Sequence, residues 1–144
     1  MEALTSFPPV RVGAARDLAH RLLRGLPERW EHTAGVAHRA AQIAVTVGPD
    51  DGDLLVAAAR GLAADLARYP REESPLADAL TYADQTVGPY GRPVGVRQRM
   101  SGMLARHGAD SPHARVHRRR GPYLLAVARR VQRRLARAAA ECRR

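Results

Sequence analysis

Apolar residues recur at helical spacing along most of this chain, and prolines and glycines separate the segments in which they do so. Leu18, Leu22 and Leu26 form one such stripe, which ends at Pro27. Spacings of three and four residues are typical of an amphipathic helix. The pattern predicts helices over about residues 14–26, 28–47, 54–69, 75–86, 96–106, 112–120 and 122–144.

Three of these predicted helices have recognisable starts. Ser74–Pro75 and Ser111–Pro112 each place a capping hydroxyl before a proline at the first helical position. Gly121–Pro122 suggests a further break and restart, which divides the end of the chain into a short basic helix and a longer one. The turn-rich stretch 88–93 (GPYGRP) predicts a loop.

The pattern predicts an all-α fold. No segment alternates apolar and polar residues with β-branched enrichment, as a half-buried strand would. Aromatic residues make up only 4% of the chain and the apolar content depends on alanine, which favours closely packed helices. We expect one helical domain over residues 1–144, with 1–13 irregular and 122–144 forming a basic terminal helix.

Charge is unevenly distributed along the sequence. The formal net charge is +10, and all 24 basic residues are arginine. Eleven of them, with the single acid Glu141, lie between Arg115 and Arg144, so the rest of the chain is neutral. The complete absence of lysine and asparagine is typical of codon bias in a GC-rich genome and needs no functional explanation.

Several classes of protein are disfavoured. No apolar run approaches the roughly 20 residues that span a bilayer, and the first ten residues do not resemble a secretory signal. The single Cys142 permits no internal disulfide, and no cysteine cluster suggests zinc. We expect a cytoplasmic protein without a transmembrane segment.

Two polar residues interrupt apolar helix faces. His32 projects close to Val36 and Ile43, and Asp84 projects close to Leu80 and Ala77. A carboxylate on a core-facing stripe must be paired, hydrogen-bonded or metal-bound, because burying it alone is costly. A buried hydrogen bond or ion pair is the simpler interpretation, and a metal site is the alternative.

Two segments resemble motifs of the HD-domain phosphohydrolases. Residues 30–37 (WEHTAGVA) are similar to the first motif of that superfamily. Residues 74–84 (SPLADALTYAD), with Gly88–Pro89 after them, are similar to the last motif of a bacterial subgroup. Residues 94–107 also resemble that subgroup, in which an arginine-containing helix follows the loop. In all, the resemblance covers about residues 14–135.

The resemblance implies an HD-like helical bundle and a metal site. Members of the superfamily bind a divalent metal through a first histidine, a consecutive His–Asp pair and a final aspartate. By motif position His32 is the first ligand and Asp84 the last.

The central His–Asp pair is missing, however. No His-Asp dipeptide occurs in the sequence, and Leu54–Ala59, which resembles the residues that lead to it, is followed by Arg60–Asp65 (RGLAAD). We therefore expect an HD domain of reduced size, with an internal segment missing near residues 59–60. Two ligands are fewer than a divalent ion needs. We expect no cofactor, and a divalent metal (Mn, Mg, Fe or Zn) only where other residues complete the site.

The C-terminal segment is a candidate anion-binding surface. Leu124, Val131 and Leu135 lie on one face of the predicted helix, and arginines cluster opposite them. A solvated charged face is the simpler interpretation; binding to nucleic acid or an anionic surface is the alternative. The candidate residues are Arg118, Arg119, Arg120, Arg129, Arg130, Arg133, Arg134 and Arg137.

Three functions stay open. The first is a degenerate HD-domain protein without catalytic activity, in which His32 and Asp84 pair with each other or with Arg39. The second is a residual metal-dependent phosphohydrolase acting on a phosphorylated small molecule or nucleotide, with its site completed by another chain or by a residue outside the motifs. The third is a basic binding module. Apolar faces exposed by the missing segment would also favour a homo-oligomer.

Overall fold

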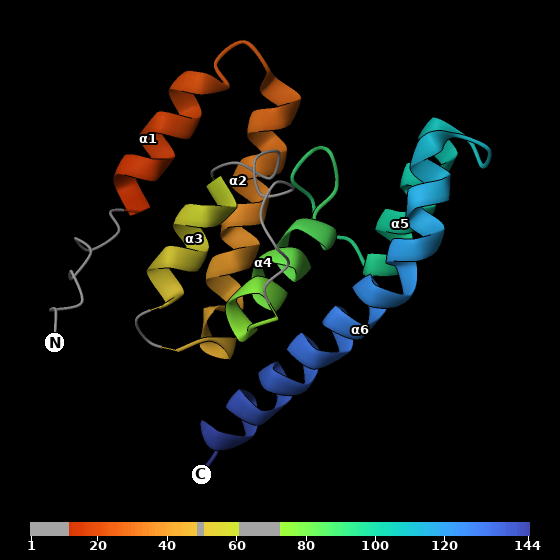
Figure 1. The fold of residues 1–144 in the computed structure, drawn as a ribbon. Coiled ribbons are helices and arrows are strands. Elements are labelled where there is room, and N and C mark those ends of the chain that lie inside the picture. The colour runs from red at the N-terminus through yellow and green to blue at the C-terminus, as the bar shows by residue number, and fades with distance from the viewer. Residues whose placement is uncertain (1–11, 49–50, 61–72) are drawn as a thin grey trace, which may run out of the picture.

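The computed structural model describes residues 12–48, 51–60 and 73–144, and within them the chain is all-helical, as predicted (Figure 1). The only β pairing in these ranges is an isolated antiparallel bridge between Val87 and Pro93. The elements are α1 (Val12–Leu22), α2 (Pro27–Gln42), the 3₁₀ helix η1 (Ala44–Thr46), α3 (Gly52–Arg60), α4 (Pro75–Gln85), α5 (Val96–His107) and α6 (Pro112–Glu141).

The predicted helix starts are confirmed at two serines. Ser74 accepts a hydrogen bond from the amide of Ala77, and Ser111 accepts one from the amide of Ala114, each at 3.1 Å. In both cases the hydroxyl satisfies an amide that has no partner within its own helix, and the following proline occupies a position where no amide hydrogen is needed.

Several predicted boundaries differ from the structure. The helix predicted over 14–26 ends at Leu22, and the one predicted from residue 54 begins at Gly52. The helix predicted over 28–47 ends at Gln42 and continues as η1, where the Thr46 hydroxyl donates to the carbonyl of Ile43 at 2.7 Å. A threonine hydroxyl competes with the amides for backbone carbonyls and so tightens this last turn. At the N-terminus, Val12 and Gly13 already belong to α1 rather than to an irregular segment. The predicted continuation of α3 to residue 69 lies outside the described residues.

The prediction of two helices over 112–120 and 122–144 is wrong. One helix, α6, runs through both, and Pro122 lies inside it. An interior proline costs about 3 kcal/mol because it removes one hydrogen bond and crowds the preceding turn. Burial on both sides offsets this cost, since Ala114 before the proline and Leu124 after it are both buried.

Helix α4 occupies the middle of the molecule and contacts α2, α3, α5 and α6 (Figure 1). Small residues on both α2 and α4 are fully buried, since Ala37, Ala40, Ala79 and Ala83 are all at most 1% exposed. The other buried core residues are Val36, Ile43, Leu55, Tyr82, Val87, Val96, Leu124, Val127, Ala128 and Val131.

The leucine stripe predicted over residues 14–26 faces outward in the described structure. Leu18, Leu22 and Leu26 are 49%, 71% and 50% exposed, while Ala19 is the buried residue of this helix. Helix α1 packs on α3, and His20 meets Trp30 edge to face at 4.8 Å between ring centroids. The spacing of the leucines therefore predicted a helix, but not the face that it buries.

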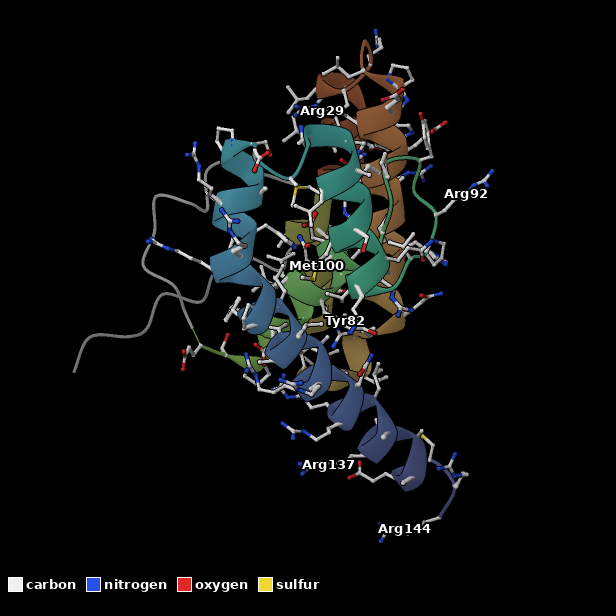
Figure 2. The ribbon with its side chains drawn as sticks, turned by 90° about the vertical axis from the view of Figure 1, so that its right-hand side faces the viewer. Arg29, Tyr82, Arg92, Met100, Arg137 and Arg144 are labelled. Carbon is white, nitrogen blue, oxygen red and sulfur yellow. The ribbon has the colours of Figure 1, made fainter. Side chains whose placement is uncertain are left out.

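Helix α6 is the longest element, and its C-terminal end extends past the other helices (Figure 1). Figure 2 shows Arg137 and Arg144 on this extension, away from Tyr82 and Met100 in the body. None of the described helices combines the length and the apolar character required to cross a membrane.

The loop from Thr86 to Val94 is folded back on α2. The amide of Val94 donates to the carbonyl of Thr86 at 2.9 Å, and the amide of Gly88 donates to the carbonyl of Arg92 at 2.8 Å. Gly91 has φ of +74°, a conformation that favours glycine. It lies directly against Gly35, so the backbones of the loop and α2 touch at this point.

Gly35→Ala is expected to destabilise the protein by about 1–3 kcal/mol, as an overpacked contact does. A Cβ atom at position 35 would lie 2.6 Å from both Cα and O of Gly91, and backbone atoms cannot move aside as a side chain can. The matched control is Gly102→Ala in α5, where a Cβ atom meets nothing within 4 Å. It should stabilise the helix by up to about 1 kcal/mol. Urea denaturation of both variants measures the difference, and equal stability would contradict the contact.

Candidate functional site

His32 and Asp84, which the resemblance implied as metal ligands, lie side by side. His32 comes from the middle of α2 and Asp84 from the last turn of α4. The distance between His32 Nε2 and Asp84 Oδ1 is 3.3 Å, and both side chains are partly buried. The pairing with each other, one of two possibilities raised by the sequence, is therefore present.

The remaining polar atoms of this pair also have partners. His32 Nδ1 lies 2.9 Å from the carbonyl oxygen of Gly88, and Gln85 Nε2 donates to Asp84 Oδ2 at 2.6 Å. A carbonyl oxygen only accepts, so Nδ1 carries a hydrogen. Nε2 faces the Asp84 carboxylate, which also only accepts, so a hydrogen bond there needs a hydrogen on Nε2.

Asp84 is held in its charged form. Burial by itself raises the pKa of this carboxyl, but the hydrogen bond and charge of His32, the charge of Arg99 and the hydrogen bond from Gln85 outweigh it. The net result is a pKa below the ordinary 3.8. Asp84 is therefore an anion at neutral pH and needs a positive partner beside it.

Arg39, the other partner considered for the pair, binds elsewhere. Its Nε donates to the Thr86 hydroxyl at 3.2 Å and an Nη donates to the Tyr82 hydroxyl at 3.3 Å. The guanidinium also lies over the Tyr82 ring, 5.4 Å from its centroid. Thr86 hydroxyl in turn donates to the carbonyl of Tyr82 at 2.7 Å. Sequence reasoning missed Thr86, although its position at the end of α4 favours a local hydrogen bond of this kind.

The described residues around His32 and Asp84 do not fit a divalent metal. Within the ranges that the structure describes, no three His, Cys, Asp or Glu side chains come close enough to hold a metal ion. His32 and Asp84 supply two ligands, whereas zinc sites normally use three or four protein ligands and magnesium or manganese sites about six ligands in all. The geometry does retain one feature of metal-binding histidines, which commonly donate their other ring nitrogen to a backbone carbonyl.

Two of the predicted anion-binding arginines are already bound to a carboxylate. Arg130 donates to both oxygens of Asp78, at 2.8 and 2.6 Å, and Arg134 donates to one of them at 2.9 Å. Asp78 is only 4% exposed and belongs to α4. Sequence reasoning missed it, although an acid between apolar residues in a predicted core helix is the same signal that drew attention to Asp84.

The other predicted anion-binding residues remain on the surface. Arg129, Arg133 and Arg137 are exposed along α6, and Arg133 and Arg137 line a hollow of about 250 Å³ together with Arg130 and Arg134. Arg118, Arg119 and Arg120 are exposed nearer the start of the same helix. The structure thus separates the predicted set into an ion-paired part and a solvated part.

Asp78→Asn is expected to lower the free energy of unfolding by about 1–3 kcal/mol near neutral pH, because it unpairs two guanidinium groups. Burial raises the pKa of Asp78, but Arg130 and Arg134 outweigh it and hold the pKa below the ordinary 3.8. The carboxylate therefore stabilises the folded state above about pH 4, and this contribution is lost as the pH falls through the lower, folded-state pKa.

Urea denaturation between pH 3 and 7 should accordingly show the wild type and Asp78→Asn converging at the acid end. The exposed Asp110→Asn serves as the control, and its difference from the wild type should stay small throughout. A wild-type advantage that does not shrink on acidification would contradict the ion pair.

Comparisons with protein-family models, with curated proteins and with solved structures found no match for this chain.

Proposed function

We propose that this chain is an HD-domain-like helical protein without hydrolytic activity, in which the remnant of the metal site has become a structural contact. The observation that carries the proposal is the meeting of His32 and Asp84. These residues are 52 positions apart and come from the two segments that resemble the first and last metal-binding motifs. In a helical bundle unrelated to that superfamily, nothing would require these two motif positions to be neighbours.

The same pair supports the loss of activity. Metal-dependent phosphoester hydrolysis needs an ion that binds water as hydroxide and neutralises phosphate charge. Here Asp84 is engaged by His32 and Gln85, and His32 by Asp84 and Gly88. Because the His–Asp dipeptide is absent from the sequence, no motif residue supplies the missing ligands.

The pair has a clear mechanical role instead. His32 joins α2 to the end of α4 through Asp84 and to the following loop through Gly88. Arg39, almost two turns further along α2, repeats this linkage through Tyr82 and Thr86. Together they hold the loop in place against α2, where Gly35 and Gly91 touch.

Two other functions remain as alternatives. A residual phosphohydrolase requires ligands from another chain or from residues outside the motifs. A basic binding module is favoured by one observation, the exposure of Arg129, Arg133 and Arg137 on a helix that extends beyond the body (Figure 2). Nucleic acid bound there would be held mainly through its phosphates.

His32→Ala is expected to destabilise the protein by about 1–3 kcal/mol, because it removes the histidine partner of a partly buried carboxylate and of a loop carbonyl. His38→Ala on the same helix is the matched control, since His38 is exposed and bonded only to the neighbouring Gln42. Its effect should stay within about 0.5 kcal/mol. Urea denaturation gives both values.

The wild-type protein should bind no stoichiometric divalent metal. It should also not hydrolyse nucleotides or p-nitrophenyl phosphate in the presence of Mn²⁺ faster than the reaction proceeds without protein. Elemental analysis and a turnover assay test this. One metal ion per chain, or turnover that disappears in both His32→Ala and Asp84→Ala, would establish the residual phosphohydrolase instead.

The triple variant Arg129→Gln, Arg133→Gln, Arg137→Gln tests the binding module. If α6 binds nucleic acid, the wild type should retard a DNA or RNA duplex on a gel at low salt. The triple variant should then lose most of this binding, and added salt should weaken it steeply. Negative gel-shift and anionic-liposome assays at low salt would exclude this function.

A further inference from the structure

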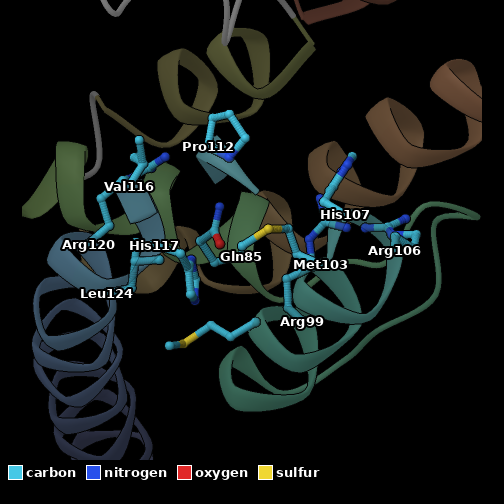
Figure 3. Close-up of a pocket in the computed structure, with 11 residues that line it drawn as sticks. Gln85, Arg99, Met103, Arg106, His107, Pro112, Val116, His117, Arg120 and Leu124 are labelled. Carbon is cyan, nitrogen blue, oxygen red and sulfur yellow. The ribbon is translucent and has the colours of Figure 1, made fainter. Parts of the chain in front are cut away.

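A hollow of about 470 Å³ lies between α5 and α6, and Gln85, which donates to Asp84, forms part of its lining (Figure 3). Figure 3 shows side chains from α5 on one side, side chains from α6 on the other, and Gln85 from the end of α4 between them. Its volume falls in the range of small-molecule sites, which is about 300–1,000 Å³. The lining residues are Gln85, Arg99, Met100, Met103, Arg106, His107, Pro112, Val116, His117, Arg120 and Leu124.

Among the described residues that line the hollow, three are arginines and none is an acid, so positive charge gathers there. Burial lowers the pKa of Arg99, and the charge of Arg106 lowers it further. The charge of Asp84 raises it, but not enough to reverse the change. Asp84 itself is engaged by His32 and Gln85. Like charges gathered in one hollow repel each other unless an anion lies between them.

His117 adds an unsatisfied polar atom to the same wall. Its Nε2 is buried and has no hydrogen-bond partner within the described part of the chain. Burial and the charge of Arg120 lower the pKa of His117, so the neutral ring is favoured. A buried polar atom without a hydrogen bond costs about 1–3 kcal/mol, and a ligand that carries a hydroxyl or an oxygen acceptor recovers that cost.

The rest of the hollow is apolar and adaptable. Met100 and Met103 on α5 face Val116 and Leu124 on α6. Unbranched thioether side chains fill irregular space and adjust to different ligand shapes. Such a wall suits a ring or short aliphatic body, whereas a bare inorganic anion leaves it uncovered.

We propose that this hollow binds a small organic anion, with a phosphate or phosphonate head held by Arg120 beside the unpartnered Nε2 of His117 and an apolar body against the two methionines. Guanidinium forks match the oxygens of a phosphoryl group better than any other side chain does. This site does not depend on hydrolysis or on a metal. It therefore goes beyond the proposed function and is tested independently of it.

Isothermal titration calorimetry with phenylphosphonate tests the site, because this probe combines the head and the ring and has no ester bond to hydrolyse. Methylphosphonate offers the head without the ring, and benzyl alcohol the ring without the charge. Saturable binding of phenylphosphonate at one site per chain, at least tenfold tighter than either comparator, is the expected result (about 1.4 kcal/mol).

Two arginines of α6 give a matched pair of variants. Arg120→Gln and Arg129→Gln remove the same charge from the same helix, but only Arg120 lines the hollow. Arg120→Gln should weaken phenylphosphonate binding about tenfold or more, as loss of a charged hydrogen bond does, whereas Arg129→Gln should change it less than twofold. Thermal denaturation shows that both variants are folded.

Three results would overturn the proposal. The first is no saturable phenylphosphonate binding by folded wild-type protein. The second is an equal loss in Arg120→Gln and Arg129→Gln, which would assign the binding to the general charge of α6. The third is equal affinity for phenylphosphonate and methylphosphonate, which would mean that the methionine wall contacts nothing.

Discussion

Helix α4 is surrounded by other helices, so each polar group that it carries inward needs a partner from another element. Asp78 finds Arg130 and Arg134 on α6, and Asp84 finds His32 on α2. Tyr82 lies between them and accepts from Arg39, also on α2. These polar contacts join the two neighbours of α4 at fixed positions along its length. Apolar packing alone, between surfaces made largely of alanine, would define that register less sharply.

This constraint also changes the meaning of the charge on α6. From the sequence alone, the C-terminal arginines are expected to form a single basic surface. In the folded chain Asp78 neutralises part of it, because Arg130 and Arg134 turn toward α4. The exposed Arg129, Arg133 and Arg137 are what remains for solvent or a partner. Near the start of the same helix, Arg120 and His117 line the hollow against α5. One basic helix thus has three distinct electrostatic environments.

Gln85 lies where the contact of His32 with Asp84 and the hollow meet. Its amide donates to Asp84, and its side chain also lines the space between α5 and α6. Arg99 has the same double position, since it lines the hollow and its charge acts on Asp84. The proposed binding site and the contact of His32 with Asp84 are therefore electrostatically linked through Arg99.

Features that depend on neighbouring residues could be predicted from the sequence alone. Helical spacing, the serine caps at Ser74 and Ser111, and the loop after α4 are all set by neighbouring residues, and the structure follows them. The polar interruptions at His32 and Asp84 were also visible as positions that required partners. Local rules failed at Pro122, where the predicted break is absent from α6.

Which polar side chains pair with one another depends on the tertiary structure. It pairs His32 with Asp84 and assigns Arg39 to Tyr82 and Thr86. It also turns the leucine stripe predicted over residues 14–26 outward and carries α6 through its proline. Each of these outcomes depends on contacts between residues far apart in the chain. Long-range burial and ion pairing there contribute enough to outweigh a local preference of a few kcal/mol.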